Sequence, residues 1–129
     1  MWHIRKFIPQ TLQKRLPKEI KIVEISESKS RKFNREYRKK NKPANVLSFL
    51  YGSDYGEILV CPEIVQKEAK KQRNSYKYQM TWMVLHGILH LAGLHHEKSR
   101  NTAKIIEKLE QRILGKIFVT QVRGKATRV

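Results

Sequence analysis

The sequence contains one cysteine, few acidic residues and no long apolar stretch. The single cysteine, Cys61, excludes an internal disulfide and fits a reducing compartment, and we expect it to be a small buried hydrophobe at a strand end. No stretch approaches the roughly 18 apolar residues of a membrane-spanning helix. Residues 1–9 are basic but lack the apolar core and cleavage site of a secretory signal, so we expect a cytoplasmic protein.

The shortage of acidic side chains gives the chain a large positive charge. Its 28 Lys and Arg residues outnumber its 11 Asp and Glu residues, so the formal net charge is +17. Such a charge indicates a polyanionic partner, either a nucleic acid or an anionic membrane surface. No basic amphipathic helix presents a clean apolar face, so the sequence favours nucleic acid over a membrane. A length of 129 residues predicts one domain, residues 1–129.

The spacing of apolar residues predicts an α+β fold, in which a small central sheet is covered by helices. Strands are expected over residues 20–25, 46–51 and 57–61, the last two forming a hairpin. Helices are expected over residues 26–40, 62–72 and from residue 76 onward. In the first of these helices, Phe33 and Tyr37 are spaced to point toward the core.

The two ends of the chain are less regular. Residues 1–19 form an N-terminal arm or short helix in this interpretation. A final helix should begin near Ser99 or Asn101 and stop at Gly115. The apolar stripe of that helix comprises Thr102, Ile105, Ile106, Leu109 and Ile113. Residues 116–129 then form a basic C-terminal tail, with a further strand over residues 117–119 and a mobile arm as the two alternatives.

Residues 86–96 hold four of the five histidines of the chain. His86 and His90 are four residues apart, so on a helix both imidazoles lie on one face and can reach one ion. Gly93 can end that helix in a left-handed turn, after which His95 and His96 can return toward the pair. Three imidazoles suit zinc and leave a fourth tetrahedral position open, as in catalytic rather than structural zinc sites.

Histidine pairs at this spacing also arise by chance, but here a third histidine follows a helix-ending glycine. The spacing H-x-x-x-H-x-x-G-x-x-H gives a zincin-like arrangement on a central helix and matches the layout of the metzincin proteases. The residue after the first histidine is Gly87, where those proteases carry the glutamate that acts as general base. A peptidase of that mechanism is therefore disfavoured.

The histidine segment resembles the YbeY family of bacterial rRNA maturation factors, whose pattern is roughly H-G-x-L-H-L-x-G-Y-D-H. The resemblance implies that His86, His90 and His96 are the metal ligands. The chain departs from the family pattern at Leu94 and His95, where the family usually has Tyr and Asp. His95 therefore places a rival ligand beside His96 and removes a carboxylate that could orient a ligand.

A second segment, residues 33–49, resembles the family pattern L-N-x-x-Y-R-G-K-D-x-P-T-D-V-L-S-F, and the resemblance places Arg38 in the active cleft. A run of charge is commonly just a solvated surface, but nearly all of this charge has one sign, which favours phosphate binding. We predict that six further residues bind nucleic acid: Arg31, Lys32, Arg35, Lys39, Lys40 and Lys42. Glu57 could approach the metal, but a position at a strand edge, paired with one of the many lysines, is the expected arrangement.

The resemblance implies a metal-dependent endoribonuclease specific for single strands, acting in 16S rRNA 3′-end maturation and ribosome quality control. We expect one zinc ion per chain, with another divalent metal as the alternative, and the resemblance implies RNA as substrate and the small ribosomal subunit as partner. Arg38 would stabilise the extra charge on phosphorus, while water activated by the metal or the RNA 2′-OH would be the nucleophile. The open alternatives are an RNA-binding assembly factor with a structural metal and a metalloprotease-like hydrolase. No aromatic RNA-binding motif is evident, so affinity should come mainly from phosphates.

Overall fold

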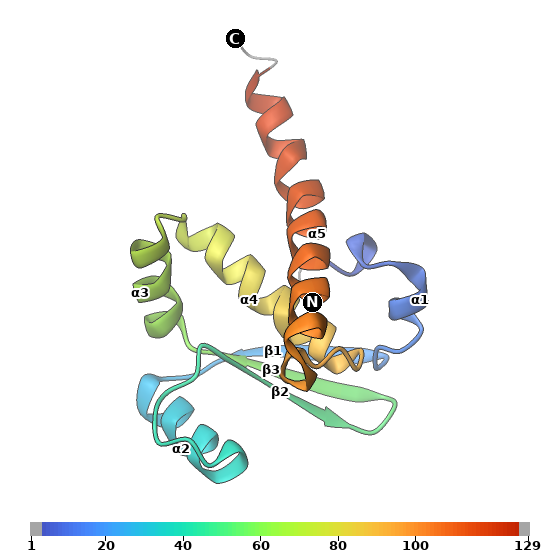
Figure 1. The fold of residues 1–129 in the computed structure, drawn as a ribbon. Coiled ribbons are helices and arrows are strands. Elements are labelled where there is room, and N and C mark those ends of the chain that lie inside the picture. The colour runs from blue at the N-terminus through green and yellow to red at the C-terminus, as the bar shows by residue number, and fades with distance from the viewer. Residues whose placement is uncertain (1–3, 127–129) are drawn as a thin grey trace.

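The computed structural model describes the backbone of residues 4–126 and the side chains of residues 4–118. At its centre is a three-stranded sheet of β1 (Glu19–Glu24), β2 (Val46–Tyr51) and β3 (Tyr55–Val60). The strand order is β1-β3-β2, with β1 parallel and β2 antiparallel to the middle strand. The three strands and the hairpin predicted from the sequence are therefore confirmed, and β2 is left as an edge strand (Figure 1).

Helices cover both faces of the sheet, which confirms the α+β fold (Figure 1). On one face lies α2 (Glu27–Arg38), and on the other α4 (Tyr76–Leu91) crosses the strands. The remaining helices surround α4: η1 (Arg5–Phe7), α1 (Gln10–Gln13), α3 (Pro62–Gln72), η2 (His96–Lys98) and α5 (Arg100–Ala126). Within residues 4–126, no helix combines the length and the apolar character needed to cross a membrane.

The central helix α4 is held close to the sheet by a glycine. Ten of its 16 residues are buried, as expected for a helix that is apolar on nearly all sides. A Cβ on Gly87 would lie 2.9 Å from both Ile58 Cγ2 and Ser48 Oγ, so a larger residue could not pack here without displacing the strands. Ser48 Oγ also donates to the Gly87 carbonyl at 3.2 Å. This contact sets the distance between the helix that carries the histidines and the edge strand.

The helix α2 is joined to the following loop by two buried polar residues. Ser26 caps the helix, and Lys39 ends it in a left-handed conformation with φ of 56°. Ser30 Oγ donates to the Ala44 carbonyl at 2.7 Å, and Asn34 Nδ2 donates to the Lys42 carbonyl at 2.8 Å. Hydrogen bonds therefore hold the loop that leads into β2 against the helix, and Ala44 of this loop also packs against a small apolar cluster.

Phe33 and Tyr37 of α2 differ in how far their side chains are buried. Phe33 packs against a small second core formed by Ile25, Leu47 and Leu59. Tyr37 does not point into the core, contrary to our expectation, because it is 64% exposed. It lies one turn beyond Phe33, where its ring packs edge-on against Phe49 of the edge strand and leaves much of the side chain exposed.

The two ends of the chain are more ordered than the sequence suggested. Ile4, Ile8 and Leu16 are buried in the main core, so residues 4–19 pack against the domain.

The final helix does not stop at Gly115 and no strand forms over residues 117–119, because α5 continues to Ala126. Glycine costs a helix only ~1 kcal/mol, and Ile113, Leu114, Ile117 and Phe118 pack into or against the core on both sides of it. Ile105, expected in the apolar stripe, is 60% exposed. Residues 127–129 of the expected tail lie outside the described residues.

Candidate active site

A cavity of about 270 Å³ lies between the end of α2, the edge strand β2 and the C-terminal half of α4. Around this cavity the structure brings together Arg38, His86, His90 and His96. Arg38 is the last residue of α2, His86 and His90 lie on α4, and His96 begins η2. Helix α4 ends as the sequence predicted: Gly93 has φ of 92°, and the Leu94 amide donates to the Leu89 carbonyl at 3.0 Å.

The orientation of His86 is set by a buried carboxylate on α5. Glu110 is only 4% exposed and accepts two hydrogen bonds, one at each oxygen. Trp82 Nε1 donates to Oε1 at 3.0 Å, and His86 Nδ1 lies 2.6 Å from Oε2. When Glu110 accepts at both oxygens, the proton shared with His86 belongs to Nδ1, and Nε2 is then the atom able to bind a metal.

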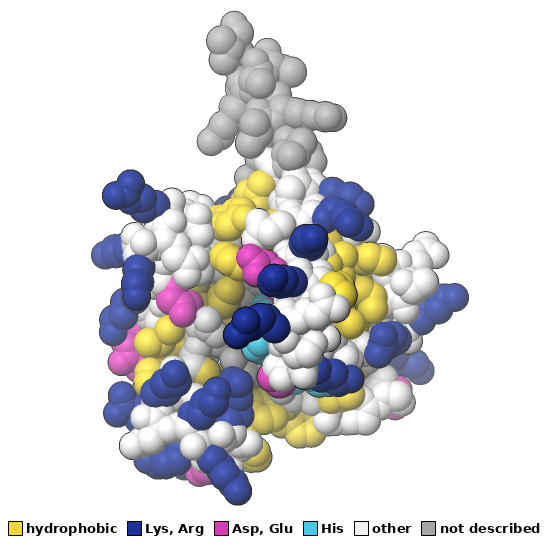
Figure 2. Space-filling model, in the orientation of Figure 1, with side chains coloured by type: hydrophobic (Ala, Val, Ile, Leu, Met, Phe, Trp, Pro, Cys, Tyr) yellow, Lys and Arg dark blue, Asp and Glu magenta, His cyan; other side chains and the backbone are white. Residues whose placement is uncertain are grey.

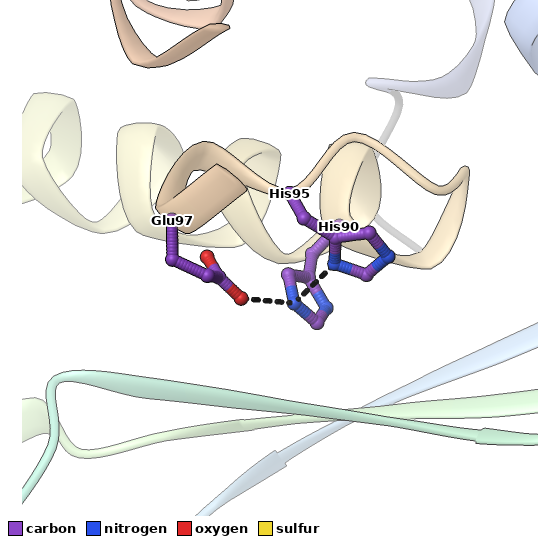
Figure 3. Close-up of side chains that lie close together, drawn as sticks. All are labelled: His90, His95 and Glu97. Carbon is purple, nitrogen blue, oxygen red and sulfur yellow. Dashed lines mark hydrogen bonds and ion pairs between the residues drawn. The ribbon is translucent and has the colours of Figure 1, made fainter. Parts of the chain in front are cut away.

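His90 lies between two further groups, as Figure 3 shows. Its Nε2 atom is 3.0 Å from His95 Nδ1 and 3.7 Å from Glu97 Oε1. Burial, helped by the neighbouring His95, lowers the pKa of His90. The neutral imidazole that a metal requires is therefore the favoured form at neutral pH.

His90, His95 and Glu97 form a group that could hold a metal ion, because their donor atoms all lie within 4.8 Å of one another. The ligand set expected from the sequence, His86, His90 and His96, lines the cavity, and the centres of the His86 and His96 rings are 4.8 Å apart. Among the described residues, however, the group of closely spaced donors includes neither His86 nor His96. Imidazole nitrogens with one carboxylate oxygen form a donor set that suits a divalent transition metal, so the residues present fit such an ion.

Two acidic residues of this site were not predicted. Glu97 contacts both His90 and His96, the latter through Oε2 at 3.1 Å from Nδ1. Partial burial raises the pKa of Glu97, but a backbone hydrogen bond and the nearby histidines outweigh it, so the pKa is lower than usual. Its position directly after the motif was a signal that could have been used. Glu110 had no such signal, because 24 residues separate it from His86.

Arg38 is the basic residue of α2 that reaches the histidines. It lines the histidine cavity and also the adjoining hollow beside Trp82 and Glu110. Among the described residues it has no ion-pair partner and no side-chain hydrogen bond. Its guanidinium is therefore available to an anionic ligand.

The six other basic residues are all exposed: Arg31, Lys32, Arg35, Lys39, Lys40 and Lys42. Lys and Arg side chains gather over α2 at the lower left of Figure 2, and a histidine is visible in a recess near the centre of that face. Arg31, Lys32 and Arg35 line a separate hollow that also contains Glu27 and Glu63. The structure thus gathers these cations on one surface beside the histidine cavity, while the part around this hollow is of mixed charge.

Glu57 is neither beside the histidines nor paired with a lysine among the described residues. It is in the middle strand, so it is not at an edge. Its Oε2 accepts a hydrogen bond from the Tyr55 hydroxyl at 2.8 Å. Glu57 lines a groove on the α2 side of the sheet, whereas the histidines project from α4 on the other side.

Comparison with known proteins extends this description. The model of the Endoribonuclease YbeY family matches residues 2–118. Endoribonuclease YbeY of Thermotoga neapolitana is 37% identical over 112 residues, 81% of this chain and 75% of the relative. The Pseudoalteromonas translucida protein of the same name is 39% identical over 108 residues, 78% of this chain and 70% of the relative. The solution structure of TM1509 from Thermotoga maritima superposes with a TM-score of 0.62 at 26% identity, covering 98% of this chain and 85% of that one.

An α+β fold with a histidine-lined cavity beside a basic surface, and with a group of side chains that could hold a metal ion, fits an enzyme of the hydrolase class. The family follows from the match over nearly the whole chain. This chain belongs to the YbeY family of endoribonucleases.

Proposed function

We propose that this chain is a metal-dependent endoribonuclease that cuts single-stranded RNA, and that residues 1–129 form one catalytic domain. The observation that carries the proposal is the cavity shared by Arg38, His86, His90 and His96. The family match and the net charge of +17 support RNA as the substrate.

In this proposal His86, His90 and His96 hold one zinc ion. Zinc bound there would supply Lewis-acid chemistry, polarising a phosphoryl oxygen and lowering the pKa of a water molecule. Glu110 holds His86, which lines the cavity, in the tautomer that leaves Nε2 without a proton. Burial keeps His90 in its neutral form by lowering its pKa. Glu97, whose lowered pKa keeps it ionised at neutral pH, is the carboxylate that lines the cavity and can accept a proton there.

Arg38 has the role of binding the scissile phosphate. Its guanidinium is planar, always charged and able to donate to two oxygens at once. Negative charge increases on the phosphoryl oxygens as the attacking oxygen adds to phosphorus, so a fixed cation beside them stabilises the transition state more than the ground state. The free guanidinium at the rim of the histidine cavity is placed for this contact.

A protease mechanism is opposed by packing as well as by sequence. In the metzincin layout the residue after the first histidine is the catalytic glutamate. That position is Gly87 here, and a Cβ on it would lie 2.9 Å from Ile58 Cγ2 and Ser48 Oγ. The position therefore faces the sheet, and no acidic side chain can be accommodated there without disrupting the packing.

We further propose that the biological substrate is the 3′ region of 16S rRNA and that the small ribosomal subunit supplies the choice of cleavage site. The support is the family match together with a basic surface that offers charge but little means of reading sequence. Quality control of ribosomes and a cytoplasmic location follow from the same proposal.

The test is cleavage of a labelled single-stranded RNA from the 3′ region of 16S rRNA, compared with a duplex of equal length. We expect cleavage of the single strand, loss of cleavage with a chelator and recovery when zinc is restored. Arg38→Ala should lower the cleavage rate about 100-fold while RNA affinity changes by less than about twofold. Lys32→Ala is the matched control and should alter both quantities little. Binding without metal-dependent cleavage would instead identify an RNA-binding assembly factor.

A further inference from the structure

A groove with exposed aromatic side chains lies on the α2 side of the sheet. It has a volume of about 170 Å³, and its floor consists of apolar side chains of the sheet. The walls carry Lys29, Phe33 and Tyr37 from α2, and Phe49, Tyr51 and Glu57 from the strands. The groove could not be predicted from the sequence, because its residues come from segments that are far apart in the chain.

The aromatic rings in and beside the groove lie next to one another in space. The Tyr37 ring lies 6.2 Å from Phe33 and 5.1 Å from Phe49, in an edge-on arrangement with the latter. Tyr51 stacks on Tyr55 of the neighbouring strand at 5.8 Å. Tyr37 is 64% exposed and Tyr51 is 57% exposed. Large exposed rings grouped in this way indicate a binding surface, because burying them against a partner is favourable.

The groove adjoins the histidine cavity. Tyr37 and Phe49 line both hollows, so their paired rings form the boundary between them. Arg38 follows Tyr37 in the chain and lines the histidine cavity. A nucleic acid strand whose phosphate contacts Arg38 can therefore pass over the edge strand β2 and place a neighbouring nucleotide against Tyr37.

The charges in the groove favour a base over a phosphate. Its two charged lining residues are Lys29 and Glu57, so the groove has no excess of positive charge. Glu57 would repel a phosphate, whereas an uncharged base is not repelled by its carboxylate. The hydrogen bond to Glu57 raises the pKa of Tyr55 to about 12, which keeps that phenol protonated as the donor.

Resting on the endoribonuclease function proposed above, we propose that this groove is a nucleobase subsite for single-stranded RNA, in which Tyr37 and Tyr51 stack on a base adjacent to the phosphate held by Arg38. Stacking tolerates any base, because every base has a π-face. The subsite therefore distinguishes single strands from duplexes, whose bases are already stacked, without selecting a sequence.

The experiment compares two ligands of equal length and charge: a single-stranded oligoribonucleotide and the same backbone with its bases removed. Affinity is measured for the full chain, both loaded with zinc and after chelation, by fluorescence anisotropy at fixed salt. Tyr37→Ala and Tyr51→Ala should each weaken binding of the intact oligonucleotide at least about fivefold and leave binding of the abasic backbone unchanged. Tyr37→Phe should retain the affinity of the parent chain.

Tyr76→Ala is the matched control, because Tyr76 is an exposed tyrosine at the start of α4 and outside the groove. Equal losses for both ligands, no loss for either, or the same loss in the control would each overturn the proposal. Because binding is measured after chelation as well, failure of the subsite is separable from failure of the nuclease. A protein that stacks bases but never cleaves RNA would retain the subsite and lose the proposed function.

Discussion

At the scale of single residues, the site depends on how each histidine is held rather than on the number of histidines. Glu110 contacts His86, His95 and Glu97 contact His90, and His96 contacts Glu97 and the His86 ring. Only the first contact is to a buried carboxylate that also accepts from Trp82. His86 is therefore the best oriented of the proposed ligands.

Glu110→Gln should weaken metal binding by about 10- to 100-fold, the usual effect of losing a group that orients a ligand. A carboxylate accepts at both oxygens, whereas an amide accepts at only one, so a glutamine side chain at this position cannot serve both Trp82 and His86. Zinc affinity is measured by competition with a chromophoric chelator. Glu107→Gln, an exposed acid on the same helix, is the control. Unchanged affinity in Glu110→Gln would show that the carboxylate serves packing alone.

Alanine variants of single histidines should show which set of donors binds the metal. We expect metal content to fall in His86→Ala and His96→Ala and to be retained in His95→Ala. Binding by His90, His95 and Glu97 instead would reverse this pattern, with His95→Ala and Glu97→Ala losing the metal. Atomic absorption of the purified variants measures the content. Circular dichroism of each variant checks that the helices are intact.

At the scale of elements, two glycines in helices have opposite surroundings. Nothing lies within 4 Å of a Cβ added to Gly115 in α5, whereas a Cβ on Gly87 in α4 would lie 2.9 Å from Ile58 Cγ2 and Ser48 Oγ. Gly115→Ala should therefore raise the free energy of unfolding by ~0.5–1 kcal/mol, because it only removes the flexibility of glycine. Gly87→Ala should lower it by ~1–3 kcal/mol through overpacking.

Chemical denaturation of the two variants measures these changes. The pair is informative because the substitution is the same and only the surroundings differ. A stabilised Gly87→Ala variant would mean that α4 is not pressed against the sheet at this position. A destabilised Gly115→Ala variant would mean that α5 does not continue through Gly115 in solution.

At the scale of the whole molecule, the net charge of +17 should dominate RNA affinity. A plot of log affinity against log salt should be steep, with a slope of about −0.7 for each phosphate contacted on a single strand. Two unrelated single-stranded RNAs of equal length should give similar lines, since neither phosphates nor stacking reads the sequence. A salt titration by filter binding measures this. A flat response, or a hundredfold preference for one RNA at every salt concentration, would contradict it.

The slope of log affinity against log salt should also change when positive charge is removed from α2. Replacing both Arg31 and Arg35 with Gln should make the slope shallower if these exposed residues contact phosphates. The same number of substitutions at Lys70 and Lys71, two exposed lysines near the end of α3, is the control and should alter the slope less.

Local features of this protein were determined by the sequence itself. The caps at Ser26 and Ser75, the hairpin and the left-handed turn at Gly93 depend on residues a few positions apart, where backbone preference and periodicity act directly. The two histidines on one face of α4 belong to the same class, because helical geometry alone places them together. The α+β fold class could be predicted for the same reason, because the spacing of apolar residues within each segment indicates whether it forms a strand or a helix.

Tertiary structure alone decided the features that join distant segments. Glu110 reaches His86 because α5 packs beside α4, and Gly115 is helical because buried neighbours outweigh its poor propensity. Tyr37 and Glu57 line one groove because α2 packs against the sheet and β3 lies between the other two strands, which places residues from distant segments together. Periodicity shows which face of a helix or strand is apolar. It does not show which other element packs against that face or how far the packing extends, because both depend on contacts between residues far apart in the chain.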